Sequence, residues 1–373
     1  MLKRTLSLLM VFCLGTFLVD CSPATTGNNT CKDAEMIKHG IVHQQAGRFC
    51  GWPANNGAWN WGDEIVVGFH LKYYKESING HSIDRDKPTA RLLARSMDGG
   101  QTWTIEKPAI FNPQPGTKIE SVDCPGGIDF AAPDFAMTVR GGRFYISYDR
   151  CRNWQGPYRL PDFGQIDIMA RTDYIANSHD DCHFFLTATK PDGKEGRVFC
   201  ARTQDGGKTV RFISWIGPEP TTYNIMPSTI RLSANEIVSS TRYYDRGDIR
   251  WGRIDIYHST DNGLNWEYLG PAAETGDHSG NPPSMLKLRD GRLCLTYCFR
   301  AKPHGVRAKF SSDGGKTWGD VIHLRDDGRT WDIGYMRTVE RTDGKLVSMY
   351  YYTTENDPEQ HIAATIWDPS RFD

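Results

Sequence analysis

Four aspartates stand in nearly identical glycine-rich segments, where a carboxylate could act as a catalytic acid or could hold a turn together. The segments are SMDGGQTW at Ser96, TQDGGKTV at Thr203, STDNGLNW at Ser259 and SSDGGKTW at Ser311, and their aspartates are Asp98, Asp205, Asp261 and Asp313. A catalytic group is needed at one place, not at four. The Ser/Thr hydroxyl and the carboxylate can instead hydrogen-bond the backbone of their own turn, and the glycines allow positive φ. We therefore interpret these aspartates as structural.

The spacing of these segments indicates a repeat. The aspartates lie 107, 56 and 52 residues apart (98 to 205, 205 to 261, 261 to 313), so one unit in the first interval lacks an evident copy. SYDRCRNW, residues 147–154, keeps part of the pattern but begins inside a predicted strand, so we place the degenerate copy at Thr172 and Asp173 instead. A period near 50 residues is typical of a solenoid or a propeller.

The segments between the repeats read as β-strands. A turn followed by a β-branched or aromatic run recurs in GDEIVVGF, GGRFYISY, ANEIVSST, DGRLCLTY and DGKLVSMY, and no amphipathic helix of useful length is present. The sequence predicts an all-β fold, a six-bladed β-propeller of four-stranded antiparallel blades, as one domain over residues 36–373. The last unit lacks a fourth strand, and residues 36–43 are expected to supply it and close the ring.

The N-terminus predicts export. Lys3 and Arg4 precede an apolar run that is too short to cross a bilayer, as in a signal peptide over residues 1–21. The residues before Cys21 resemble a lipoprotein cleavage site, and residues 22–35 would form a polar tether. We expect the periplasm, the outer membrane or cell surface, or secretion, with membrane contact only through a lipid on Cys21. Among the eight cysteines beyond this region, Cys182 and Cys200 flank a predicted hairpin symmetrically, which predicts a disulfide.

Composition and motifs exclude several other functions. Lys+Arg of 44 against Asp+Glu of 45 argue against nucleic-acid binding. The sequence has no dinucleotide, phosphate-loop or zinc motif and requires no cofactor, and it leaves calcium open. The 11 tryptophans suit either sugar binding or packing between β-layers. We expect a monomer with a glycan or glycoconjugate as its substrate.

The boxes in this architecture resemble the Asp-box repeats of the sialidase (neuraminidase) superfamily, over roughly residues 36–370. The resemblance implies a glycosidase whose site lies on the face away from the boxes. It also implies three arginines for the substrate carboxylate, an Asp acid/base and a Tyr nucleophile assisted by a Glu. The matching positions are Tyr335 for the nucleophile, Asp84 or Asp86 for the acid/base, and Arg300 and Arg337 for two arginines.

Two features depart from the family pattern. Gly51 stands where the first arginine is expected, and the inner strands of the middle blades, NIMPSTIRL and GNPPSMLKL, contain no Glu. Other polar or aromatic residues occupy predicted axis-facing loops. Asp134 and His278 are further acid/base candidates there, and the candidate sugar ligands are Trp52, Asn55, Asn56, Arg242, Asn281, Arg300, Asp332 and Arg337.

The leading functional hypothesis is an exported glycoside hydrolase that removes a terminal acidic sugar. One alternative is a related propeller enzyme with other catalytic residues, either a His-dependent glycosidase or a polysaccharide lyase. Another is a glycan-binding lipoprotein without catalytic activity. The two missing residues favour the alternatives over a standard sialidase, whereas the concentration of titratable groups near the axis favours an enzyme over a binder.

Overall fold

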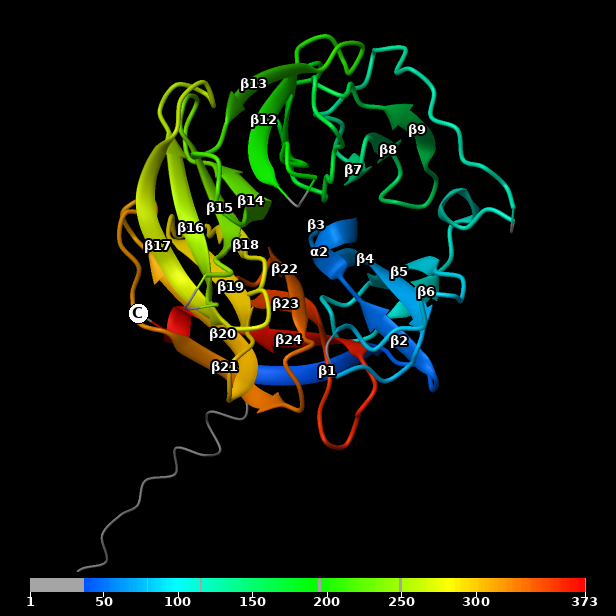
Figure 1. Cartoon of the computed structure of the whole chain (residues 1–373), viewed down its shortest axis with the longest axis vertical. Helices are drawn as coiled ribbons and strands as arrows, with labels where there is room; N and C mark the ends of the chain where they lie inside the picture. The colour runs from blue at the N-terminus through cyan, green and yellow to red at the C-terminus, as the bar shows by residue number, and fades with distance from the viewer. Residues whose placement is uncertain (1–36, 79, 115, 194–195, 248–249, 373) are drawn as a thin grey trace, which may run out of the picture. The chain divides into compact units, whose positions relative to one another are not determined.

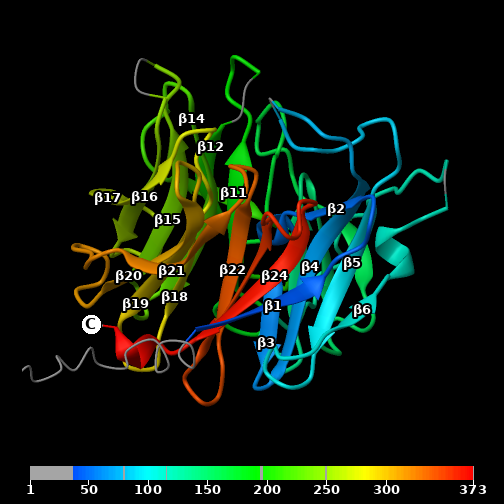
Figure 2. The ribbon, with the colours of Figure 1, turned by 90° about the horizontal axis from the view of Figure 1, so that it is seen from below.

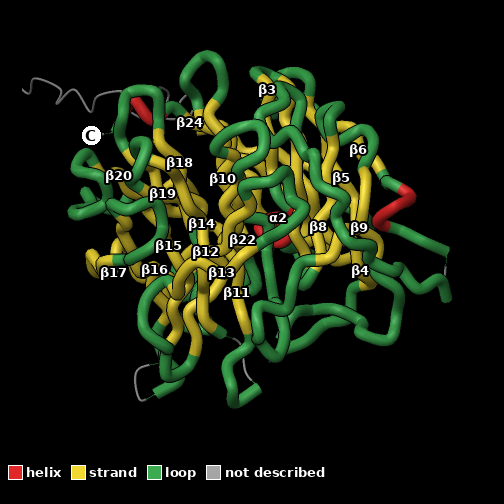
Figure 3. Tube along the Cα trace, turned by 90° about the horizontal axis from the view of Figure 1, so that it is seen from above, coloured by secondary structure: helices red, strands yellow, loops and turns green. Residues whose placement is uncertain are grey.

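The computed structural model describes residues 37–78, 80–114, 116–193, 196–247 and 250–372. The expected signal peptide and tether lie outside the described residues. Six antiparallel β-sheets form a ring, which confirms the predicted six-bladed β-propeller (Figure 1). Helices in the described part are short: α2 (Pro53–Asn56), η1 (Ala109–Phe111) and η2 (Pro369–Arg371) (Figure 3). None of the helices described is long and apolar enough to span a membrane.

Four blades have the expected four strands. Blade 3 contains β10 (Tyr174–Ala176), β11 (Cys182–Ala188), β12 (Arg197–Thr203) and β13 (Arg211–Trp215); blade 4 contains β14 (Tyr223–Arg231), β15 (Ile237–Tyr244), β16 (Gly252–Ser259) and β17 (Glu267–Gly276). Blade 5 contains β18 (Ser284–Lys287), β19 (Leu293–Phe299), β20 (His304–Ser311) and β21 (Ile322–Gly328). Blade 6 contains β22 (Gly334–Glu340), β23 (Leu346–Tyr352), β24 (His361–Trp367) and β1 (Ile37–His43).

The N-terminal strand closes the ring, as predicted. β1 pairs antiparallel with β24, from Ile37 opposite Trp367 to His43 opposite Ile362 (Figure 2). The buried side chains between neighbouring blades are largely aromatic and aliphatic; for example, the rings of Phe144 and Phe184 lie 5.8 Å apart between blades 2 and 3. This apolar packing joins sheets that share no backbone hydrogen bonds.

Blade 1 has an inner strand in two pieces. β2 (Arg48–Gly51) and β3 (Ala58–Trp61) pair with the two ends of β4 (Glu64–Tyr73), which continues into β5 (Ala90–Ser96) and β6 (Thr104–Glu106). α2 fills the interval between β2 and β3 and lies near the centre of the ring (Figure 1).

The four predicted boxes share one set of hydrogen bonds. In the first, Ser96 Oγ donates to Asp98 Oδ1 (2.8 Å), and the backbone N–H and hydroxyl of Thr102 donate to the same carboxylate (2.9 and 2.6 Å). Partial burial opposes ionisation, but these hydrogen bonds together lower the pKa of Asp98 to about 2. The pKa of Asp313 is also lowered to about 2 by the same arrangement. The boxes are structural turns.

Residues 147–154 form a fifth box, so placing the degenerate copy at Thr172 and Asp173 was wrong. Ser147 Oγ donates to Asp149 Oδ1 (2.8 Å), Cys151 N donates to Ser147 Oγ (2.9 Å), and the Asn153 side-chain amide donates to Asp149 Oδ2 (2.6 Å). Blade 2 contains only β7 (Ala136–Arg140), β8 (Arg143–Ser147) and β9 (Gln155–Arg159). Its strands correspond to the second, third and fourth strands elsewhere, so the turn at 141–142 is not the first turn of the blade.

Thr172 and Asp173 instead lead into the inner strand of blade 3. Thr172 Oγ1 accepts from Val139 N (3.1 Å), and Tyr174 Oη accepts from Met137 N (3.2 Å). These hydroxyls satisfy the inner edge of β7, where blade 2 has no inner strand to accept its N–H groups.

The predicted Cys182–Cys200 disulfide is wrong. Cys182 lies opposite Thr203 and Cys200 lies opposite Phe185, and both are free and buried. The cross-strand neighbour of Cys182 is Thr203, three residues beyond Cys200. Because the shift in register is odd, the side chains of the two cysteines lie on opposite faces of the sheet.

Candidate active site

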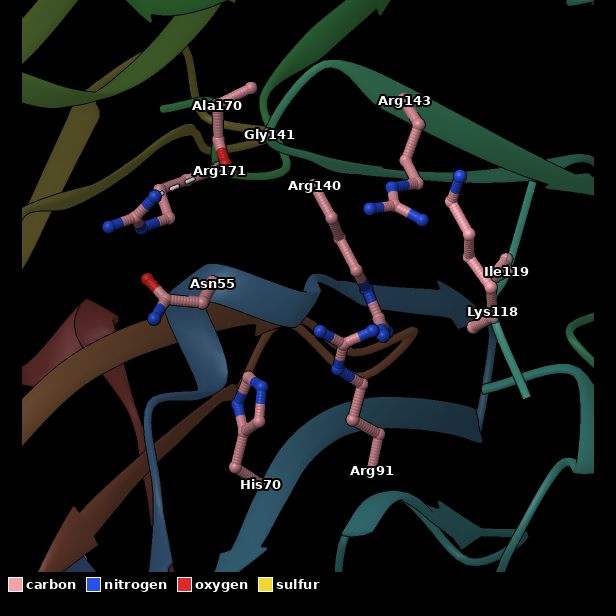
Figure 4. Close-up of a pocket in the computed structure, with 10 residues that line it drawn as sticks. All are labelled: Asn55, His70, Arg91, Lys118, Ile119, Arg140, Gly141, Arg143, Ala170 and Arg171. Carbon is pink, nitrogen blue, oxygen red and sulfur yellow. Dashed lines mark hydrogen bonds between the residues drawn. The ribbon is translucent and has the colours of Figure 1, made fainter. Parts of the chain in front are cut away.

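A pocket of about 670 Å³ opens at the ends of the strands away from the boxes, where blades 1, 2 and 3 meet (Figure 4). Arg91 lies near the start of β5, whose other end carries a box, and Arg140 lies at the end of β7. The pocket is lined by Asn55, His70, Arg91, Lys118, Ile119, Arg140, Gly141, Arg143, Ala170 and Arg171. Among the described residues, none that lines it is acidic.

The pocket concentrates positive charge. Arg91, Arg140 and Arg143 form no ion pair with a described carboxylate. Burial and the neighbouring Arg91 lower the pKa of Arg140, and burial and Arg143 lower the pKa of Arg91, although guanidinium groups remain charged at neutral pH. Arg140 Nη1 and Asn55 Oδ1 are buried without a hydrogen-bond partner in the described part of the chain. Such a site favours an anionic ligand.

His70 presents a neutral imidazole to this pocket. Asn56 Nδ2 donates to His70 Nδ1 (3.1 Å), which leaves the ring proton on Nε2. Burial and then the charges of Arg91 and Arg140 hold the pKa of His70 well below its usual range. His70 can therefore donate a hydrogen bond from Nε2 without adding a further positive charge.

A second group of residues surrounds Tyr335 at the start of β22. Arg242 Nη1 donates to the Tyr335 hydroxyl (3.1 Å), and Tyr335 N donates to Asn281 Oδ1 (3.0 Å). No hydrogen bond joins this hydroxyl to a carboxylate among the described residues. The structure thus brings together Tyr335, Arg242 and Asn281 as the sequence predicted, without the Glu that assists the family nucleophile.

Backbone strain is concentrated around this group. Non-glycine residues with positive φ include Trp52 (62°), Met226 (55°), His278 (48°), Ser279 (72°) and Tyr335 (53°). Each such conformation costs about 1–3 kcal/mol and persists only where the surroundings impose it, which is common at functional sites.

His81 and Asp332 form a pair beside Trp52. His81 Nδ1 donates to Asp332 Oδ1 (2.6 Å), and the Tyr351 hydroxyl donates to the same oxygen (2.7 Å). The Asp332 side chain is 4% exposed and that of His81 is 25% exposed. A buried carboxylate thus orients a histidine that solvent can reach, the arrangement that general acid–base catalysis requires.

Trp52 lies between His70 of the pocket and His81 of this pair. Its ring centroid lies 5.7 Å from that of His70 and 5.0 Å from that of His81. Asn56, predicted to bind sugar, is buried and supports the loop by donating to Trp52 O (3.0 Å).

Two arginines predicted to bind substrate instead donate hydrogen bonds to groups of the protein itself. Arg300 is buried and donates to the carbonyls of Ile333 and Gly280 and to the Tyr351 hydroxyl. Arg337 donates to Ala54 O (2.9 Å) and lies near Asp173 at the axis. Burial raises the pKa of Asp173 to about 7 despite this neighbouring cation. These arginines stabilise inner strands and loops.

The predicted acid/base residues do not lie together in the structure. Asp134 lies on the box face, where Arg150 of the fifth box donates to it (2.7 Å), so its expected position near the site is wrong. Asp84 accepts from Asp86 N (3.0 Å) within a loop turn, and Asp86 is exposed. His278 stacks on Trp331 with ring centroids 4.8 Å apart. Of these candidates, only His278 lies beside the Tyr335 group.

Comparisons with known proteins agree with this architecture. The family model described as "BNR repeat-like domain" matches residues 131–349, more than half of the chain. The chain belongs to the BNR repeat-like domain family. A search of curated proteins returned no match.

Solved structures share the fold of this BNR repeat-like protein at low sequence identity. One is a protein of unknown function from Dyadobacter fermentans (TM-score 0.64, 19% identity, covering 88% of this chain and 98% of that chain). Another is the NanB sialidase of Streptococcus pneumoniae (TM-score 0.59, 11% identity, covering 90% of this chain and 71% of that chain). A third is the GH93 alpha-L-arabinofuranosidase of Fusarium graminearum (TM-score 0.56, 11% identity, covering 88% of this chain and 95% of that chain). At these identities the likeness shows a shared fold.

Sequence reasoning missed most of the cationic pocket of this BNR repeat-like protein. Only Asn55 was predicted, whereas Arg91, Arg140 and Arg143 come from strand ends in two blades. Their one sequence signal is that ARLLARS, AMTVR and RFYIS each place an arginine at the strand end away from a box. His81 carried no signal, because its partner Asp332 lies 251 residues away.

Proposed function

We propose that the protein is an exported glycoside hydrolase that removes an acidic sugar from a glycan. The observation that carries the proposal is the pocket with Arg91, Arg140 and Arg143, which lie opposite the boxes without carboxylate partners among the described residues. Guanidinium groups bind sugar carboxylates through paired donors. The propeller fold shared with two glycosidases supports the reaction class, and the N-terminal sequence supports export.

In this proposal His81 supplies the proton for the leaving oxygen. Asp332 holds His81 Nδ1 and stabilises the charged imidazole, so Nε2 can give its proton to the glycosidic oxygen as the C–O bond breaks. Tyr335 Oη, which accepts from Arg242, would lose its proton to solvent and attack the anomeric carbon as in the resembled family. His81, deprotonated in the first step, would then take a proton from the water that displaces Tyr335 and releases the sugar.

The test is a release assay on sialylated and uronic-acid-containing glycans, with chromatography of the products. We expect one acidic monosaccharide to appear, and Arg140→Gln to reduce kcat/KM by about 10–100-fold, the value of a hydrogen bond to a charged group. Arg211→Gln, an exposed arginine that follows a box, is the matched control. Binding without release of any sugar would contradict hydrolysis and favour a glycan-binding protein.

A second candidate is a lyase for uronic-acid glycans, favoured by the absence of acidic side chains among the described pocket residues and by the neutral His70. The arginines would neutralise the uronate carboxylate. With the Asn56 amide reversed, so that its Oδ1 accepts from His70 Nδ1, His70 Nε2 would take the proton at C5. The C4–O bond would then break with its electrons on the departing oxygen. Hydrolysis yields a saturated product, whereas elimination yields an unsaturated uronate that absorbs ultraviolet light, so the same assay separates the two.

A further inference from the structure

Four of the five cations of the pocket lie in two groups, and the fifth, Arg171, donates to the carbonyls of Met169 and Ala170. In Figure 4 the guanidinium groups of Arg91 and Arg140 come together beside His70, and the interaction between their charges contributes to the lowered pKa of Arg140. The ends of Arg143 and Lys118 point toward one another on the other side of the pocket (Figure 4). The two groups come from different elements: β5 and β7 supply the first, and β8 and the loop before β7 supply the second.

One carboxylate neutralises only one of these four positive charges. Two guanidinium groups can offer it up to four donors, which matches the number of acceptor positions on its two oxygens. Arg91 and Arg140 are therefore enough for one carboxylate, and Arg143 and Lys118 remain. Lys118 pairs with Glu120 at 3.7 Å, and both side chains are largely exposed (86% and 76%), so this ion pair contributes little to stability.

We infer that the pocket accepts a saccharide with two anionic groups, a carboxylate held by Arg91 and Arg140 and an anionic ester, sulfate or phosphate, held by Arg143 and Lys118. This inference rests on the proposed function, because it names the substrate class of the same pocket. An ester anion suits the outer pair because its terminal oxygens can accept from an ammonium and a guanidinium at once. Asn55 Oδ1, buried without a described partner, is free to accept from a sugar hydroxyl.

Calorimetric titration of the folded protein tests the inference. The probes are the unsaturated chondroitin disaccharide without sulfate, the same disaccharide sulfated at position 4, 6 or 2, and glucuronic acid 1-phosphate with glucuronic acid as its reference. We expect at least one doubly charged probe to bind about 10-fold or more tightly than its singly charged reference. A sulfated disaccharide or the sugar phosphate as the preferred probe identifies the ester.

Two variants assign the groups. Arg143→Gln should weaken the doubly charged probe about 10-fold more than it weakens the singly charged probe. Arg140→Gln should weaken both probes by about 10-fold or more. Arg211→Gln should change neither.

Equal affinity of every doubly charged probe and its reference would overturn the inference, as would failure of all probes to bind. Equal affinities would leave the hydrolase proposal intact, since that proposal needs one anion only. If Arg143→Gln weakened all probes alike, the assignment of two separate groups would also be wrong.

Discussion

The two faces of the propeller use charged side chains in opposite ways. On the box face, each box aspartate accepts hydrogen bonds from its own turn, and Glu64 is neutralised by Arg95, Arg150 and Arg152 at 2.6 to 2.9 Å. On the other face, Arg91, Arg140 and Arg143 crowd one pocket without a described carboxylate. The charged groups of the box face are paired within the protein and stabilise the blades. The arginines of the pocket have no such partner among the described residues, and unpaired charges are stable only where solvent or a ligand can reach them.

The difference separates fold from function. The boxes recur five times, and their hydrogen bonds repeat almost atom for atom, so none is a candidate for a unique reaction. The pocket and the His81–Asp332 pair occur once in the described chain, at strand ends and loops that do not repeat. Substitutions on the two faces should therefore have separable effects on stability and on activity.

The largest expected effect is on catalysis at His81. His81→Ala should reduce kcat by about 10²–10⁴-fold, because it removes the proposed proton donor. It should lower the melting temperature only moderately, because the buried Asp332 loses one hydrogen bond but keeps that from the Tyr351 hydroxyl. The matched control is His179→Ala: His179 also contacts an aspartate (Asp129, 2.7 Å) but lies near the box of blade 3. If both variants kept full activity, or both lost it equally, His81 would not be the acid.

Asp173 should make the stability of the fold depend on pH in the direction opposite to that of the box aspartates. Its folded pKa of about 7 is above the unfolded value near 3.9, so the folded state holds a proton that the unfolded state releases, and stability falls as pH rises from about 4 to 7. Asp173→Asn lacks this group, and should gain about 2–4 kcal/mol relative to the wild type between pH 4 and pH 8, measured by urea unfolding.

Asp98→Asn is the control for that measurement. The folded pKa of Asp98 is lowered to about 2, so its contribution is present above about pH 4 and is lost as pH falls toward 2. Asp98→Asn should therefore lose stability at pH 7 and approach the wild type near pH 2. A parallel pH profile for the two variants would contradict the assigned pKa directions.

The repeated part of the fold could be predicted from sequence because each box is local. The hydrogen bonds to the box aspartate join residues at most four positions apart, so the motif itself encodes the turn. Even the closing strand β1 could be expected from the missing strand of the last unit. The prediction failed where spacing alone was used. The fifth box was rejected because it follows the turn at Gly141 too closely, and that reasoning assumed an inner strand that blade 2 lacks.

The candidate site could be predicted only in part. Tyr335, Arg242 and Asn281 were found because the family pattern and the loop positions pointed to them. Arg91, Arg140 and Arg143 act together through the meeting of two blades, and nothing in the chain order records that meeting. Arg300 and Arg337 resembled substrate ligands in sequence, yet backbone carbonyls use their donors, because loops around the axis need such partners.

The fifth box should contribute as much to stability as the evident ones. Asp149→Ala removes the acceptor of Ser147 Oγ and of two Asn153 donors, and should destabilise the fold by about 1–3 kcal/mol without changing kcat. Asp313→Ala is the matched variant in a box evident from sequence. If Asp313→Ala lowered the free energy of unfolding and Asp149→Ala did not, the hydrogen bonds of the fifth box would form without stabilising the fold.

The smallest expected effect is on stability, and it compares Arg91, which has no ion pair with a described carboxylate, with Arg152, which has one. The two substitutions should change the free energy of unfolding in opposite directions. Arg91→Gln relieves repulsion from Arg140 and Arg143 and breaks no side-chain hydrogen bond in the described part of the chain, so it should stabilise the unliganded protein by about 0.5–1 kcal/mol at low salt. Arg152→Gln breaks the ion pair with Glu64 (2.8 Å) and should destabilise by a similar amount. Both differences should shrink in 1 M salt, where the screening length is only about 3 Å. Denaturant unfolding at the two salt concentrations measures this, and destabilisation by Arg91→Gln at low salt would mean that the pocket does not store repulsion between its cations.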